Sequence, residues 1–139
     1  MLVKTLALRS GYDEAVILDP QGFVAECTGE NIFMVRKGVL YTPPLANVLE
    51  GLTRDSVITL AGDAGIRVEE KLFTRDQLYI ADEIFITGTA AEMVGVVKVD
   101  HRQIKDGQVG PLTRSLSQAF SETVHGNGKH SPSWLDYLE

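Results

Sequence analysis

Residues 26–33, Glu-Cys-Thr-Gly-Glu-Asn-Ile-Phe, constrain the fold more than any other stretch of this chain. They place two carboxylates, a carboxamide and a glycine between two runs of strand-like residues. Burying such polar groups beside apolar strands costs free energy unless each group has a hydrogen-bond partner. A carboxylate at the end of a buried strand, here Glu26, can hold a cation or a protonated ring nitrogen. Strand alternation alone equally allows Glu26 to lie on an exposed strand edge.

The size and charge of the chain argue against several classes of protein. Its 139 residues suit one domain, and a hydrophobic content of 44% is enough for a core. The net charge of −6 argues against a nucleic-acid-binding face, which is normally basic. The single cysteine, Cys27, fits a reducing compartment. Because no apolar run approaches the roughly 20 residues of a membrane span, we expect a cytoplasmic protein that binds neither nucleic acid nor membrane.

The remaining pattern predicts intermixed strands and helices, a mixed α/β or α+β fold class. Alternating or apolar runs predict strands at residues 14–18, 23–26, 31–36, 39–42, 66–73, 83–87 and 93–99. Helices are expected between Gly51 and Gly65 and from Pro111 onward, with a short helical turn at residues 74–79. Residues 1–10 suggest the end of a helix that stops at Gly11. Because the chain would then begin in the middle of a helix, we expect a portion of the protein upstream.

Two loops combine glycine with a hydroxyl group. Residues 51–53 (Gly-Leu-Thr) precede a predicted helix, whose first turn offers unpaired N–H groups suited to a phosphate. Residues 88–90 (Gly-Thr-Ala) follow a predicted strand and offer further backbone N–H groups and the hydroxyl of the threonine. Taken singly, each loop is more simply explained as a helix cap or a tight turn. The three histidines lack the spacing of metal ligands, so we expect no metal site.

Several short blocks, taken in order, resemble the C-terminal large domain of fold-type IV pyridoxal-phosphate enzymes. They are residues 26–33 (ECTGENIF), 40–44 (LYTPP), 49–54 (LEGLTR), 78–83 (LYIADE) and 87–92 (TGTAAE). Within the class IV aminotransferases, the chain is most similar to the branched-chain amino acid aminotransferases, over nearly its whole length. The resemblance implies the D-amino acid aminotransferase-like fold, a mixed sheet or pseudo-barrel with flanking helices.

The same resemblance implies an activity. Branched-chain transaminases use pyridoxal 5′-phosphate to transfer the amino group of leucine, isoleucine or valine to 2-oxoglutarate, as part of branched-chain amino acid biosynthesis. The expected partners are therefore a small amino acid, a 2-oxo acid and a second copy of the chain in a dimer. Two alternatives stay open: another class IV enzyme, such as a D-amino acid aminotransferase or an aminodeoxychorismate lyase, or a non-catalytic remnant that self-associates through exposed apolar surface.

The resemblance also implies roles for individual residues. Glu26 matches the carboxylate that pairs with the pyridinium nitrogen, which keeps the ring protonated as an electron sink. Leu52 and Thr53 match a phosphate site at a helix start, and Thr89 matches a second hydroxyl at the phosphate. The full set expected at the cofactor is Glu26, Glu30, Asn31, Gly51, Leu52, Thr53, Gly88 and Thr89. The residues expected at the substrate are Gly29, Thr89 and Ala90.

The chain departs from the family pattern at three places. Cys27 stands where glycine is usual, and Val94-Gly95 stands where Thr-Pro is common. The lysine that forms the Schiff base lies well before the Gly11-Tyr12 pair in the family, and no lysine here has the matching context. We therefore expect residues 1–139 to form a single cofactor-binding C-terminal domain, without the small N-terminal domain and without a catalytic lysine, that is inactive alone.

Overall fold

The fold is taken from a computed structural model that describes residues 4–9, 13–27, 31–44, 52–87 and 93–124. Only the backbone is described for residues 4–9, 13–15, 17, 26, 27, 52, 53 and 124.

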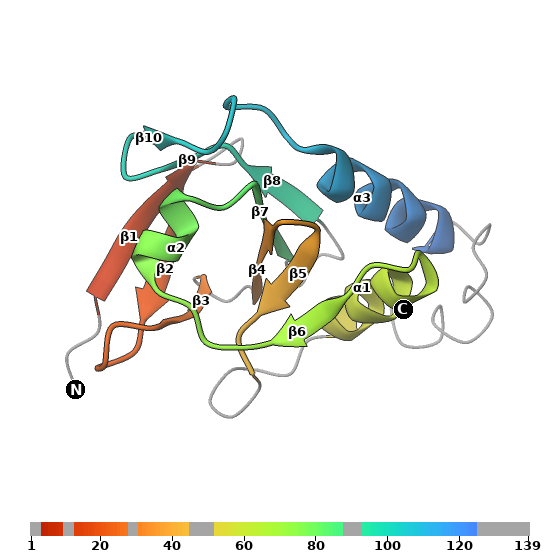
Figure 1. The fold of residues 1–139 in the computed structure, drawn as a ribbon, viewed down its shortest axis with the longest axis horizontal. Helices are drawn as coiled ribbons and strands as arrows, with labels where there is room; N and C mark the ends of the chain where they lie inside the picture. Colours follow the sequence, from red (N-terminus) through yellow and green to blue (C-terminus); the bar gives the residue numbers. More distant parts are fainter. Residues whose placement is uncertain (1–3, 10–12, 28–30, 45–51, 88–92, 125–139) are drawn as a thin grey trace.

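The described residues form two five-stranded sheets, a short helix and two longer helices (Figure 1). The first sheet is antiparallel in the order β10-β9-β1-β2-β3, with strands β1 (Lys4–Arg9), β2 (Asp13–Leu18), β3 (Val24–Cys27), β9 (Lys98–Val99) and β10 (Arg102–Gln103). The second has the order β6-β5-β4-β7-β8, with strands β4 (Asn31–Arg36), β5 (Val39–Thr42), β6 (Val68–Glu70), β7 (Glu83–Thr87) and β8 (Met93–Val96). The helices are α1 (Leu52–Asp63), α2 (Arg75–Tyr79) and α3 (Pro111–Val124).

Local turn chemistry sets two hairpins between strands that the sequence predicted. The carbonyl oxygen of Asp19 accepts a hydrogen bond from the Gly22 backbone at 2.9 Å, and its side chain accepts two more backbone N–H groups. This turn joins β2 to β3. Lys37 and Gly38 both have positive φ, 51° and 79°, as a two-residue turn between twisted strands requires. This second turn joins β4 to β5.

The helix end expected at residues 1–10 is wrong. Residues Lys4–Arg9 form β1, which pairs with β2 along its whole length, from Lys4 opposite Leu18 to Arg9 opposite Asp13. A short apolar run fits helical and strand periods almost equally well, and the partner strand decides between them. The expectation of a helix that starts upstream loses its basis for the same reason.

Two further strand predictions are only partly correct. Residues 66–73 contain just the short strand β6, which lies at a sheet edge and pairs in parallel with β5. Residues 93–99 divide into β8 in the second sheet and β9 in the first. The chain thus passes from one sheet to the other at Val97. After β9, Asp100 and His101 form a turn and Arg102–Gln103 adds β10.

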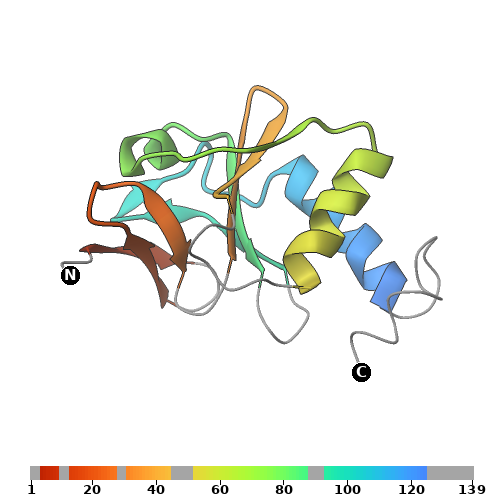
Figure 2. The ribbon, with the colours of Figure 1, turned by 90° about the horizontal axis from the view of Figure 1, so that it is seen from below.

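Two apolar clusters lie on opposite faces of the second sheet, in which β4 and β7 are interior strands. Ile32 and Ile86 face the first sheet, together with buried residues of β2, β3 and α2. Phe33 and Phe85 face the other way, toward α1 and α3, which cover that side (Figures 1 and 2). On α1 and α3, the residues Val57, Leu60, Ala61, Leu116 and Phe120 are buried and belong to the cluster that contains Phe33 and Phe85. Among the described residues, no helix has the length and apolar character needed to cross a membrane.

Candidate functional site

The ends of four elements lie along one edge of the molecule (Figure 2). β3 ends at Cys27 and β7 at Thr87, while β4 begins at Asn31 and α1 at Leu52. The strand register places Asn31 directly opposite Thr87, and Thr87 opposite Met93 at the start of β8. We call the region marked by Cys27, Asn31, Leu52 and Thr87 the site edge. The sequence blocks expected to form a site therefore lead to a common place in the fold.

The structure describes part of the predicted site. Glu26 lies in β3 opposite Ile17, and Asn31 is the partly buried first residue of β4. Leu52 and Thr53 are the first two residues of α1, as the predicted helix start requires. The other predicted site residues lie outside the described residues: Gly29, Glu30, Gly51, Gly88, Thr89 and Ala90. The roles of all the predicted site residues stay predictions.

The structure accommodates two of the departures from the family pattern. Cys27 is the last residue of β3 and pairs with Val16, so its backbone is extended and open to any residue type. Gly95 lies in β8, where an added Cβ would come within 2.7 Å of the Val109 side chain. A glycine at position 95 therefore allows the segment before α3 to approach β8 closely.

Arg54 ties the first turn of α1 to the end of β5. Its side chain is 2% exposed, donates to the Pro43 carbonyl at 3.2 Å, and pairs with Glu70 at 2.5 Å and Asp55 at 3.4 Å. Because two carboxylates surround this guanidinium, its charge is balanced locally. An anion at the start of α1 would therefore be attracted by the N–H groups that the first turn of a helix leaves without partners inside the helix.

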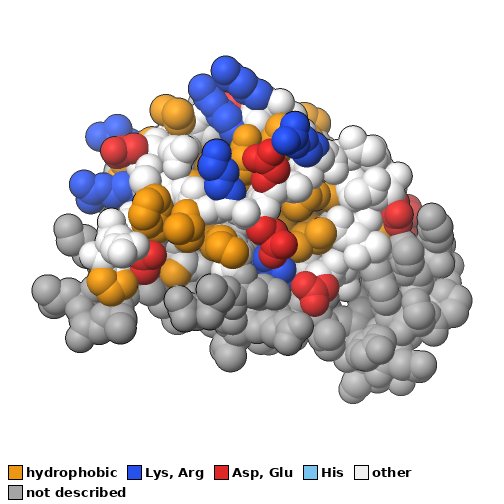
Figure 3. Space-filling model, turned by 60° about the horizontal axis from the view of Figure 1, so that its bottom comes forward, with side chains coloured by type: hydrophobic (Ala, Val, Ile, Leu, Met, Phe, Trp, Pro, Cys, Tyr) orange, Lys and Arg blue, Asp and Glu red, His pale blue; other side chains and the backbone are white. Residues whose placement is uncertain are grey.

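We expect Arg54→Ala to lower the free energy of unfolding by about 2–3 kcal/mol, since it removes buried packing together with charge-assisted hydrogen bonds. Arg67→Ala is the matched control, because Arg67 is 74% exposed and pairs with Glu69 at 2.7 Å. Basic and acidic side chains lie next to one another on the surface of the molecule (Figure 3), and such exposed pairs add little stability. Arg67→Ala should therefore lower the free energy of unfolding by less than about 0.5 kcal/mol. Urea denaturation of both variants measures the difference, and equal losses would show that burial of Arg54 adds nothing.

Thr87 combines deep burial with a hydroxyl that has no partner among the described residues. It is 1% exposed, and its Oγ1 makes no hydrogen bond to that part of the chain. Side chains two residues apart share one face of a strand, so Thr87 lies on the face of Phe85, toward α1 and α3. An unpaired buried hydroxyl costs about 1–3 kcal/mol. Sequence reasoning singled out Thr89 and missed Thr87, because all five residues of β7 are buried and only the packing shows that the hydroxyl of Thr87 is unpartnered among the described residues.

In the described part of the chain, the side chains that have shifted pKa values lie away from the site edge. The carboxylate of Asp82 accepts hydrogen bonds from the Lys37 backbone at 2.8 Å and from Lys105 Nζ at 3.0 Å, and these donors lower the pKa of Asp82. The hydroxyl of Tyr79 donates to Asp100 at 2.7 Å, which raises the pKa of Tyr79. Both groups precede β7 in the chain, whereas the site edge lies where β7 ends.

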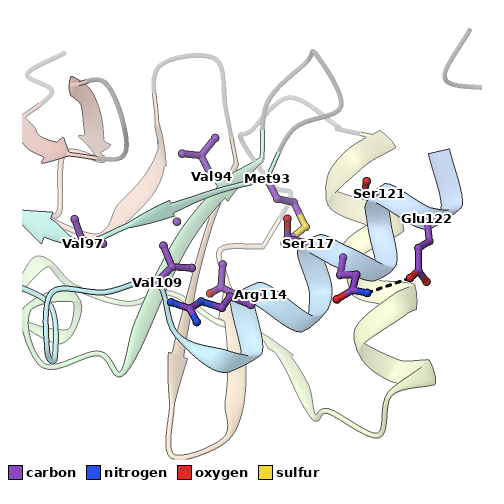
Figure 4. Close-up of a pocket in the computed structure, with 11 residues that line it drawn as sticks. Met93, Val94, Val97, Val109, Arg114, Ser117, Ser121 and Glu122 are labelled. Atoms are coloured by element: carbon purple, nitrogen blue, oxygen red, sulfur yellow. Dashed lines mark hydrogen bonds between the residues drawn. The ribbon is translucent and has the colours of Figure 1, made fainter. Parts of the chain in front are cut away.

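A groove of about 750 Å³ lies between β8 and α3 (Figure 4). One wall is apolar and is formed by Met93, Val94, Val97 and Val109. The other wall is polar and belongs to α3, where Gln118 Nε2 donates to Glu122 Oε1 at 3.2 Å. Of the predicted site residues that the structure describes, none lines this groove, and Met93 is its link to the site edge. The groove therefore lies beside the site edge and does not include the described residues of the predicted site.

Comparison with known proteins relates the chain to one family. The family model described as amino-transferase class IV matches residues 1–99. A probable branched-chain-amino-acid aminotransferase of Aquifex aeolicus is 48% identical over 136 residues, which cover 96% of this chain and 44% of that protein. The branched-chain-amino-acid aminotransferase of Escherichia coli K12 is 44% identical over 139 residues, 99% of this chain and 45% of its own length. The chain thus spans less than half of these relatives.

Solved structures give the same relation. The T.th. branched-chain amino acid aminotransferase complexed with N-(5′-phosphopyridoxyl)-L-glutamate superimposes with a TM-score of 0.85 at 48% identity. The match covers 89% of this chain and 42% of that one. The branched-chain aminotransferase of the archaeon Thermoproteus uzoniensis with norvaline gives a TM-score of 0.83 at 47% identity, over 89% of this chain and 41% of that one. The two-sheet arrangement described above is therefore the fold of fold-type IV aminotransferases.

Proposed function

Because this chain belongs to the class IV amino-transferase family, we propose that it is the cofactor-binding domain of a branched-chain amino acid aminotransferase. The observation that carries the proposal is the convergence of four element ends at the site edge, in a chain 48% identical to a relative named for this activity. The reaction transfers an amino group from leucine, isoleucine or valine to 2-oxoglutarate. The whole protein would be a cytoplasmic homodimer. This domain would form one part of each of its chains.

The donor set at the site edge fits a phosphate-bearing pyridine cofactor. Helix α1 is 12 residues long, and the N–H groups of its first turn have no partners within the helix. Such a helix start favours an anion, which suits the phosphate of pyridoxal 5′-phosphate. Glu26, in the strand β3 that ends at the same edge, would supply the carboxylate that a protonated ring nitrogen requires. The edge would thus offer donors for the phosphate and an acceptor for the ring.

Each residue of the site has a defined task in this proposal. Bound pyridoxal 5′-phosphate supplies an electron sink for the charge that develops at the substrate Cα. Glu26 holds the proton on the ring nitrogen and so preserves that electron sink. The backbone of Leu52 and the backbone and hydroxyl of Thr53 bind the phosphate. The remaining predicted residues complete the pocket around cofactor and substrate: Gly29, Glu30, Asn31, Gly51, Gly88, Thr89 and Ala90.

We further propose that these 139 residues bind the cofactor without a covalent bond. A transaminase needs a group that bonds to the cofactor aldehyde and moves the proton at the substrate Cα. Lys37 and Lys105 both contact Asp82, which precedes β7, and so lie away from the site edge at the other end of that strand. Neither these two lysines nor any other lysine of the chain has the sequence context of the family's catalytic lysine.

Titration of the purified chain with pyridoxal 5′-phosphate, followed by absorbance, tests the proposal together with a leucine–2-oxoglutarate assay. We expect saturable binding that is stronger than the binding of pyridoxal, which lacks the phosphate, and no glutamate formation above background. Absence of saturable binding would contradict the cofactor-binding role. Ordinary turnover would retain that role and overturn the non-covalent mode of binding.

A further inference from the structure

We propose that the hydroxyl of Thr87 is a further phosphate-binding group, which donates a hydrogen bond to the phosphate of the cofactor at the site edge. This inference rests on the proposed function and adds to it a residue that the sequence did not indicate.

The burial of Thr87 is the first observation behind this assignment. The residue is 1% exposed, and its Oγ1 has no hydrogen-bond partner within the described part of the chain. Thr42, which also ends a strand of the same sheet and is equally buried, donates its hydroxyl to the Ile32 carbonyl at 2.9 Å. A buried hydroxyl at a strand end can therefore find a partner within this fold, whereas the hydroxyl of Thr87 is left available for a ligand.

The direction of the side chain is the second observation. Glu83, Phe85 and Thr87 alternate along β7 and share one face of the sheet. Glu83 on this face accepts hydrogen bonds from the backbone at the start of α3, and Phe85 packs in the cluster that contains α1. Thr87 therefore points to the helix side of the sheet. That is the side on which α1 begins, next to the end of β7 (Figures 1 and 2).

The chemistry of the hydroxyl agrees with this location. The start of α1 favours an anion, and the oxygen atoms of a phosphate there carry more lone pairs than the first-turn N–H groups alone can satisfy. A hydroxyl that donates to a charged oxygen makes a stronger hydrogen bond than one to a neutral acceptor. Among the described residues, the hydroxyl of Thr87 has no acceptor and its surroundings are apolar. Both features make such a bond favourable.

The experiment compares the binding of pyridoxine 5′-phosphate and of pyridoxine by isothermal titration calorimetry. Neither compound carries the aldehyde that would react with surface lysines. We expect Thr87→Val, which keeps the shape and removes the hydroxyl, to weaken binding of pyridoxine 5′-phosphate about tenfold and to leave binding of pyridoxine unchanged. Thr87→Ser should restore the affinity for the phosphate ester. Unfolding of the ligand-free Thr87→Val variant should occur at the same or a higher urea concentration, because an unpaired hydroxyl has been removed.

Thr113→Val is the matched control, since Thr113 is 2% exposed, lies in α3 and has an Oγ1 that is equally unpartnered among the described residues. It should leave the affinity for both compounds unchanged. Equal affinities of wild type and Thr87→Val for pyridoxine 5′-phosphate would overturn the assignment of Thr87 alone. A similar loss for both compounds would overturn it too, since the hydroxyl would then not act on the phosphate. No binding of either compound by the wild-type chain would overturn the proposed function as well.

Discussion

Gly110→Ala is expected to lower the free energy of unfolding by about 2–4 kcal/mol, because the new methyl group would displace a buried carboxylate. An added Cβ would overlap both the Cγ and the Cδ of Glu83. Glu83 is 7% exposed, and its oxygens accept hydrogen bonds from the backbone of Thr113 at 2.7 Å and Leu112 at 3.2 Å. It cannot move aside without releasing the N–H groups that begin α3.

Urea denaturation followed by circular dichroism measures this effect, with Gly62→Ala as the control. Gly62 lies inside α1, and an added Cβ there would have no described atom within 4 Å. Alanine has the higher helix propensity, so the control should gain up to about 1 kcal/mol. If Gly110→Ala were as stable as the wild type, Glu83 would be free to move, and α3 would not depend on its carboxylate.

The second large effect is expected for Phe85→Ala, at about 3–5 kcal/mol of lost stability. The ring of Phe85 is fully buried and stacks on Phe33, with centroids 4.8 Å apart and planes 9° from parallel. The pair belongs to the cluster that joins the second sheet to α1 and α3. Removing one ring leaves a cavity at the centre of that cluster and also removes the aromatic contact.

Guanidinium denaturation of Phe85→Ala and of Ile80→Ala separates the effect of core packing from the effect of truncating any apolar side chain. Ile80 is an apolar residue that is 56% exposed, so its truncation should change stability by no more than about 0.5 kcal/mol. A loss for Phe85→Ala no greater than that of Ile80→Ala would mean that the helices are held to the sheet by other contacts.

The parts of the fold that depend on local signals could be predicted from the sequence. The two hairpin turns rest on Asp19 and on Lys37-Gly38, and α3 begins at Pro111, as residue types at these positions favour. Residues Lys4–Arg9 could not be assigned in this way, because their strand exists through pairing with β2 and β9. The division of residues 93–99 between two sheets likewise depends on partners distant in the chain.

The candidate site divides in the same manner. Leu52 and Thr53 could be placed at a helix start from the glycine and apolar pattern around them. Thr87 could not be singled out, because its hydroxyl, unpartnered among the described residues, becomes visible only when the packing of both faces of β7 is known. Glu83 is a similar case, since the α3 backbone that it caps lies 30 residues away at Thr113.

Mapping of pyridoxine 5′-phosphate binding on the ¹⁵N-labelled chain by NMR tests the central claim most directly. The site edge predicts saturable shifts of backbone amides in residues 26–31, 52–53 and 87–90, with smaller changes in the rest of α1. Shifts confined to the groove between β8 and α3, for example at Val97, Ser117 and Gln118, would contradict the assignment of the cofactor site.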